Sequence, residues 1–167
     1  TSNGDGTFST AITLTVSNLG NEALNAVTVT DALATTAGGN FGTYSATAPD
    51  AAGEYTVTSL GAVGLAPTAG FTGAPGNTQA ASGTLAIGAT ATVSFTLTFF
   101  PNAAGPFNNP AIATGTGAIS TTRTSDDSDD GTDSDANGDG DPTGPNEDDP
   151  TPIQVTLTPQ VGIAKAA

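Results

Sequence analysis

Residues 91–99 read Ala-Thr-Val-Ser-Phe-Thr-Leu-Thr-Phe, and apolar and hydroxyl side chains alternate along the whole stretch. Successive side chains of a β-strand point to opposite faces of its sheet, so the alternation predicts a strand with one buried and one exposed face. Threonine suits the exposed positions because a branched Cβ packs well on a pleated surface. The same alternation over 8–17, 27–30 and 153–158 predicts three more strands.

Weaker apolar runs predict further strands between these four. The 22 glycines and 11 prolines separate the runs, and no segment carries the apolar stripe of an amphipathic helix. Many short strands divided by turns are typical of two sheets packed face to face. The weaker strands are expected at 41–47, 54–60, 83–87 and 110–119. We therefore predict an all-β, two-sheet sandwich.

Two segments lack a clear strand pattern. Residues 61–82 are rich in Gly, Ala and Pro and are expected to form a long surface loop. Residues 120–150 form an acidic insert that is too long for a structureless loop in a compact domain, unless it has a function or is disordered. We expect a sandwich over 1–158 that contains this insert, followed by a separate segment over 159–167.

Acidic residues are concentrated in one part of the chain. The sequence has 16 acidic and 2 basic residues, a net charge of −14, and 11 of the acids lie within 126–149. The remainder has 5 acids and 2 bases, a net charge of −3. Arg123 and Lys165 are too few to neutralise a row of phosphates, which argues against nucleic acid and anionic membrane surfaces as partners. No run of about 20 apolar residues is present, so membrane insertion is not expected.

The available side chains also limit the chemistry. Cys and His are absent, which excludes thiol nucleophiles, thiolate metal sites and imidazole bases. Paired carboxylates can hydrolyse glycosides, but here the acids share one polar loop, and Trp, a common sugar platform, is absent. We therefore expect a structural or binding protein that is not an enzyme.

The strongest local motif is residues 133–141, Asp-Ser-Asp-Ala-Asn-Gly-Asp-Gly-Asp. Oxygen ligands at alternate positions let a short loop wrap around one hard cation, and Ca²⁺ takes six to eight oxygens at about 2.3–2.6 Å. The twelfth position is Gly144 instead of a bidentate Glu, and no flanking helix is predicted, so a helix-loop-helix site is not expected. The motif resembles the helix-free calcium loops of extracellular repeat proteins.

The acidic insert is therefore predicted to bind two or more Ca²⁺ ions. The acids of 126–130 could serve a second ion, and those of 147–149 could close either site. The candidate ligands are Asp126, Asp127, Asp129, Asp130, Asp133, Asp135, Asn137, Asp139, Asp141, Asp148 and Asp149. The alternative is a solvated, disordered acidic linker. Carboxylates this dense repel one another and need counter-ions to become ordered, which favours the ion sites.

Two other acidic positions carry weaker signals. Residues 3–6, Asn-Gly-Asp-Gly, could offer Asp5 to an ion, but such dipeptides are more typical of turns. Asp31 ends a predicted strand and is expected to cap a loop there.

The segment 159–167 alternates again, with Val161, Ile163 and Lys165 on one face of an expected strand. Pro-Gln at its start is not a hairpin dipeptide, so we expect the chain to continue outward. An unpaired apolar strand aggregates unless another sheet edge takes it. The segment could form an ordinary edge strand after a kink at Pro159, or it could complete the next copy of the domain by strand addition.

Lys165 shares its face with two apolar residues, so it is expected to point inward in that strand. An inward charge must be paired, in the simplest case with a carboxylate. A covalent bond to an Asn, as some surface domains form, is the alternative.

Placing the last residues before the first gives a strand, the Asn-Gly-Asp-Gly turn and a second strand, a hairpin across the boundary between two units. Together with Val-Ser-Asn-Leu-Gly-Asn at 16–21 and Val-Thr-Val-Thr-Asp-Ala-Leu at 27–33, this looks like the bacterial surface repeat known as domain of unknown function eleven. Asn-Pro-Ala at 109–111 matches a later Asn-x-Ala segment of that repeat.

The resemblance covers about 7–119 and 160–167, in permuted order. It implies an immunoglobulin-like sandwich that repeats along extracellular or bacterial cell-surface proteins, without catalytic activity. We therefore expect a structural subunit or repeat of an extracellular fibre, joined to identical neighbours by the C-terminal strand and stiffened by Ca²⁺. The alternative is a stalk or adhesin repeat that binds a ligand through its loops.

Overall fold

The computed structural model describes residues 1–35, 39–144 and 146–166. These residues form β-strands and no α-helix, which confirms the all-β class. They include no helix that could cross a membrane. The strands are β1 (Phe8–Ser17), β2 (Leu24–Asp31), β3 (Thr43–Tyr44), β4 (Glu54–Val63), β5 (Ala66–Pro67), β6 (Gln79–Leu85), β7 (Thr90–Phe100), β8 (Phe107–Asn109), β9 (Ala111–Gly117), β10 (Arg123–Asp127) and β11 (Thr151–Ile153).

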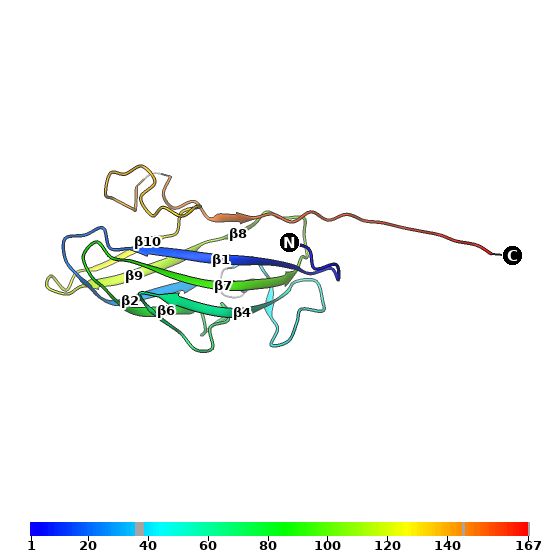
Figure 1. Cartoon of the computed structure of the whole chain (residues 1–167), viewed down its shortest axis with the longest axis horizontal. Coiled ribbons are helices and arrows are strands. Elements are labelled where there is room, and N and C mark those ends of the chain that lie inside the picture. The colour runs from blue at the N-terminus through cyan, green and yellow to red at the C-terminus, as the bar shows by residue number, and fades with distance from the viewer. Residues whose placement is uncertain (36–38, 145, 167) are drawn as a thin grey trace.

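Two sheets pack face to face as a sandwich (Figure 1). The first has the order β1-β7-β4-β3 and the second the order β10-β9-β2-β6-β5. All pairings are antiparallel except that of β3 with β4. A third, two-stranded sheet pairs β11 with β8.

The strand β7 confirms the alternation from which it was predicted. Its buried side chains are Ala91, Val93, Phe95, Leu97 and Phe99, and the residues between them are exposed or half-buried. β7 lies between β1 and β4, so both of its edges are hydrogen-bonded and its apolar face fills the centre of the core.

Aromatic rings extend the core at one end of the sandwich. The ring of Phe99 packs edge-on against Phe41 and Phe107, with centroids 5.1 Å and 5.2 Å apart. Offset and edge-to-face pairs at this spacing add to the stabilisation from burial alone. Phe107 belongs to β8, so the small third sheet is attached to the main core through this cluster.

The prediction of one surface loop over 61–82 is wrong. β4 extends to Val63, β5 intervenes, and β6 begins at Gln79. Phe71 is buried, and its ring packs edge-on against Phe95 at 5.1 Å. A single large apolar side chain therefore draws the Gly-rich segment onto the core, because burying a phenylalanine stabilises by about 1.5–3 kcal/mol.

The acidic insert is also more structured than expected. β10, which the sequence did not predict, pairs with β9 over Arg123–Asp127. The rest of the insert is a series of turns without strands among its described residues, with residue 145 outside the description.

The strand predicted over 153–158 is wrong beyond Ile153. β11 is short because prolines flank its pairing with β8: Pro106 would face the residue after Ile153, and Pro110 and Pro150 would face each other at the other end. Proline has no N–H to donate to a ladder, so the pairing cannot extend in either direction.

Candidate functional site

One side of the sandwich is open along the edge of the first sheet. Among the described strands, β1 is outermost in its sheet with β7 as its only partner, and β10 is outermost in the facing sheet. A groove of about 410 Å³ lies between these edges. Its apolar lining includes half-buried Leu14, Val16 and Leu24 and buried Val27 and Val29.

The N-terminal residues cover only the start of the β1 edge. Ser2 forms an antiparallel bridge with Phe8, and Thr1 and Ser9 exchange hydrogen bonds of 2.7 and 2.8 Å. Beyond Ser9 the outer edge of β1 has no strand partner among the described residues. The outer edge of β1 beyond Ser9 therefore presents unpaired backbone N–H and C=O groups beside the groove. Another strand could continue the sheet there.

The turn that returns the chain to β1 is the predicted Asn-Gly-Asp-Gly motif. Gly4 and Gly6 have φ of 84° and 95°. The Asp5 carboxylate accepts hydrogen bonds from the side chain and the backbone N–H of Thr7, which hold its pKa below the ordinary value. The preference for a turn at this position is confirmed, and Asp5 is engaged locally.

The C-terminal segment leaves the sandwich as an extended tail. Figure 1 shows it running away from the body past the N-terminal end of β1, while the acidic loop lies at the other end. Val161 and Ile163 are 99% and 100% exposed, and Lys165 is exposed as well. Residues 154–166 form no strand, so the expectation of an edge strand on its own sheet is wrong; Ala167 lies outside the described residues.

The acidic loop is built from consecutive turns in which aspartate side chains accept backbone N–H groups. Asp139 N–H donates to Asn137 Oδ1 and Asp141 N–H to Asp139 Oδ1, each at 2.8 Å. Gly140 N–H donates to Asp135 Oδ2 at 3.0 Å, and Gly140 has φ of 83°. This positive φ favours glycine, which explains the Gly between the acids of the motif.

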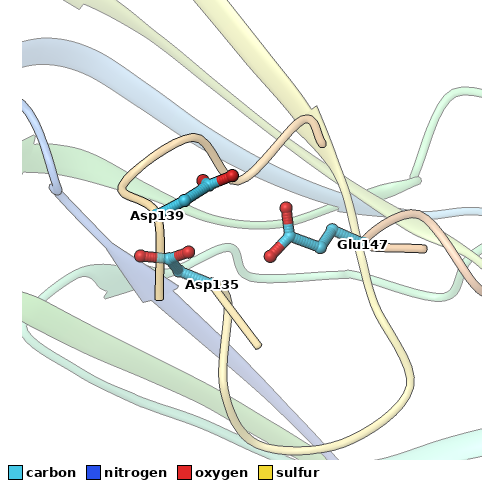
Figure 2. Close-up of side chains that lie close together, drawn as sticks. All are labelled: Asp135, Asp139 and Glu147. Atoms are coloured by element: carbon cyan, nitrogen blue, oxygen red, sulfur yellow. The ribbon is translucent and has the colours of Figure 1, made fainter. Parts of the chain in front are cut away.

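Three carboxylates converge in this loop. Ligand oxygens of Asp135, Asp139 and Glu147 all lie within 4.8 Å of one another. Figure 2 shows the Glu147 carboxylate pointing toward the other two from a separate arm of the loop. Oxygens bound to one Ca²⁺ at about 2.4 Å are at most about 5 Å apart, so the three could hold one metal ion.

Glu147 is the central residue of this cluster. It is only 2% exposed; Oε1 accepts the backbone N–H of Asn137 at 3.2 Å, and Oε2 has no hydrogen-bond partner among the described residues. A Cβ on Gly144 would lie 2.5 Å from Oε2, so a larger residue there would push the carboxylate aside. A buried carboxylate with a free oxygen needs a cation or a proton.

A second group of acids surrounds Asp126 on β10. Burial, followed by the negative charges of Asp148, Asp127, Glu147 and Asp129, raises the pKa of Asp126 to about 6. Its Oδ1 is buried without a hydrogen-bond partner among the described residues. The fold therefore brings both ends of the insert together, as the prediction of a second ion requires.

Of the predicted ligands, the structure brings Asp135 and Asp139 together with Glu147 and places Asp126 near Asp148. Asn137 and Asp141 use side-chain oxygens to cap backbone N–H groups of the same loop. Asp127, Asp130, Asp133 and Asp149 are exposed, and Asp129 is half-buried. From the sequence Glu147 is expected only to close a site and is absent from the predicted ligands, because spacing alone does not reveal which of three adjacent acids turns inward.

Asp31 does not cap a loop as expected, because it lies in the core. Its side chain is 0% exposed, its Oδ2 accepts a 2.9 Å hydrogen bond from Asn109 Nδ2, and its Oδ1 has no partner among the described residues. Burial raises the pKa of Asp31 to about 7, and the Asn109 hydrogen bond opposes the shift.

Comparison with protein families, with curated proteins and with solved structures finds no match to this chain. The resemblance to the bacterial surface repeat therefore stays a prediction.

Proposed function

We propose that the chain is a non-enzymatic structural subunit of an extracellular fibre, in which the segment 159–167 of one copy occupies the groove of the next. The observation that carries this proposal is the pairing of an open apolar groove with an exposed apolar tail on the same molecule. An immunoglobulin-like architecture with one strand supplied by a neighbour accounts for both features.

The register of the existing bridge supports the fit. Ser2 faces Phe8 and Thr1 faces Ser9, so a strand that continued this ladder without a gap would pair next with Thr10 and then along β1. The tail added in this way puts Lys165 opposite Ile12, Ile163 opposite Leu14 and Val161 opposite Val16. Opposite residues of an antiparallel pair share a face, so these side chains would point into the groove.

The energies favour a specific contact. Burying one valine and one isoleucine side chain stabilises by about 3–6 kcal/mol together. Each main-chain hydrogen bond along the added strand contributes about 0.5–1.5 kcal/mol more, because the free β1 edge presents unpaired groups.

Polymerisation is the first test. We expect the purified chain to form fibres visible by electron microscopy and light scattering, and Ile163→Asp to abolish them, since the variant would bury a charge. Leu157→Asp is the matched control, because Leu157 is exposed but precedes the donated segment. A synthetic peptide of residues 159–166 should also inhibit assembly by competing for the groove. Fibres that persist in Ile163→Asp would contradict the proposal.

The acidic loop forms one wall of the same groove, which gives the proposed Ca²⁺ a role in assembly. Asp126, Asp129, Asp133 and Glu147 all border the groove. Two or more Ca²⁺ ions, one held by Asp135, Asp139 and Glu147, would neutralise this wall and fix it. Mg²⁺ suits the loop less well, because it demands near-octahedral geometry.

Metal removal is the second test. EDTA should lower the melting temperature, and excess Ca²⁺ should restore it while Mg²⁺ restores less. A melting temperature that EDTA leaves unchanged would contradict a calcium role without affecting the strand-exchange proposal.

The tail would pair with β1 in the same register if the next unit belonged to the same polypeptide, as in a stalk or adhesin repeat. That arrangement, the second candidate, is favoured by the hairpin that forms when the last residues precede the first. Both arrangements place the protein outside the cell or on the bacterial cell surface.

A further inference from the structure

The tail contains one large apolar side chain that the strand exchange does not place. Ile153 and Val155 pack against the core of their own copy, and Val161 and Ile163 enter the groove of the next copy in the proposed fibre. Leu157 lies between these two pairs and is 52% exposed. The apolar alternation that predicted a strand here therefore continues beyond the body of the chain, into the junction between two copies.

The end of the sandwich at which the donor strand would enter presents two exposed apolar side chains. Leu19 lies in the turn after β1, and Ile119, at the tip of the β9–β10 hairpin, is 87% exposed. Figure 1 shows both turns at the end of the body opposite to the one from which the tail leaves. Leu19 also lines the groove, so this apolar surface continues the proposed interface beyond the end of β1.

Hydrogen bonds join the two turns that carry these side chains. Glu22 Oε2 accepts the backbone N–H of Ile119 at 2.9 Å and that of Ser120 at 3.0 Å, and Glu22 Oε1 accepts the Ser120 hydroxyl. From the other side, buried Asn18 donates from Nδ2 to the backbone carbonyl of Glu22 at 2.8 Å. A partner therefore meets a surface that is already held in place, which lowers the entropy cost of binding.

The register of the donor strand brings Leu157 to this surface. In the register proposed above, Gln160 faces Ser17, the last residue of β1. Pro159 has no N–H to donate, so the pairing ends at this point and the tail leaves the sheet. Leu157 lies three residues before Gln160, about 10 Å along an extended chain, and is therefore level with the turn after β1.

The direction of the side chain agrees with this position. Alternate residues of an extended chain share a face, so Leu157 points to the same side as the donor's Val161, toward the second sheet. The second sheet ends there in the β9–β10 hairpin, which carries Ile119 at its tip. The tail is extended in the structure (Figure 1), and Pro152 and Pro159 limit its bending.

We propose that Leu157 of one copy packs between Leu19 and Ile119 of the next copy, and that this second contact fixes the angle between consecutive subunits; the inference rests on the strand exchange proposed above. The contact removes three exposed apolar side chains from water. Without it, residues 156–160 would join the two bodies only as a linker. The donated strand then attaches the subunits, and the Leu157 contact stiffens the fibre.

Cysteine pairs test the contact, because the chain has no cysteine of its own. We expect the double variants Leu157→Cys/Ile119→Cys and Leu157→Cys/Leu19→Cys to assemble and, after mild oxidation, to give a ladder of oligomers in non-reducing denaturing electrophoresis. A disulfide needs Cα atoms about 4.4–6.8 Å apart, so it reports residues that lie side by side. Leu157→Cys/Val63→Cys is the matched control and should give no ladder. Val63 is exposed at the same end of the sandwich, but it lies on β4, which β7 separates from β1.

Fibre stiffness is the second measurement. Leu157→Asp should still assemble, because its donated segment is unchanged, but its fibres should have a persistence length at least twofold shorter than the wild type in electron micrographs. Fibres that give no ladder with either cysteine pair, an equally strong ladder in the Val63 control, or Leu157→Asp fibres as stiff as the wild type would overturn the contact and leave strand exchange intact. A chain that stays monomeric under all conditions would overturn both proposals.

Discussion

Replacing Asp31 by Asn should change how the stability of the monomer depends on pH. Burial raises the pKa of Asp31 from 3.8 to about 7 in the folded state. Between these two values Asp31 therefore binds more protons in the folded state than in the unfolded state, so its contribution to stability is most favourable at low pH and falls as the pH rises through this window. At about 1.4 kcal/mol per pH unit over roughly three units, the loss is about 4 kcal/mol.

Asn has the shape of a protonated Asp without the titration. We expect Asp31→Asn and the wild type to have similar free energies of unfolding near pH 4, and the variant to be more stable by up to about 4 kcal/mol at pH 8. Urea unfolding of the monomer fraction, followed by circular dichroism in saturating Ca²⁺, measures the difference. Asp126, whose pKa is raised in the same direction, is present in both proteins and cancels.

A difference that stays constant from pH 4 to pH 8 would refute the argument, because it would mean that Asp31 keeps the same proton in the folded and unfolded states.

Three further predictions concern the loop and the body of the sandwich. Glu147→Gln should weaken Ca²⁺ binding by calorimetry at least tenfold, whereas Asp133→Asn, outside the three-carboxylate cluster, should change it little. Asn18→Ala should cost about 2–3 kcal/mol in urea unfolding, since the buried Asn18 amide donates hydrogen bonds to three backbone carbonyls that would lose their partner. Gly73→Ala should lower the melting temperature much more than Gly76→Ala: both have positive φ, but a Cβ at Gly73 would lie 2.6 Å from the Leu33 side chain, while Gly76 faces open space. Equal losses in either pair, or an Asn18→Ala variant as stable as the wild type, would contradict the corresponding assignment.

The strands that depend on side-chain alternation could be predicted from the sequence. In β7, a buried apolar residue at every second position reports directly on the pleat, and the structure follows it residue by residue. β2 and β1 follow for the same reason. The bounds that depend on pairing partners were harder to predict. β11 stops at Ile153 because the next residue would face Pro106, which directly precedes β8, and nothing in 153–158 itself records this.

The position of polar groups in the fold was the main feature that the sequence left undetermined. Asp31 ends a strand in the pattern, but whether it faces solvent or the core depends on Asn109, which is 78 residues away. Glu147 likewise acquires its role from the turn at 135–140 packing against it. Local patterns carry the periodicity of a strand, whereas the burial of a single acid depends on long-range contacts.

The tail and the groove lie toward opposite ends of β1. Figure 1 shows the tail passing the end at which the strand begins, and the groove borders the residues that end the strand. In the proposed strand exchange the contact joins two unlike surfaces, and such a contact grows without a built-in limit unless its rotation closes a ring. One tip of every filament would then display a vacant acceptor and the other a bare peptide. In the proposed fibre, a different molecule could initiate or arrest elongation at either tip, by binding the vacant acceptor or the bare peptide.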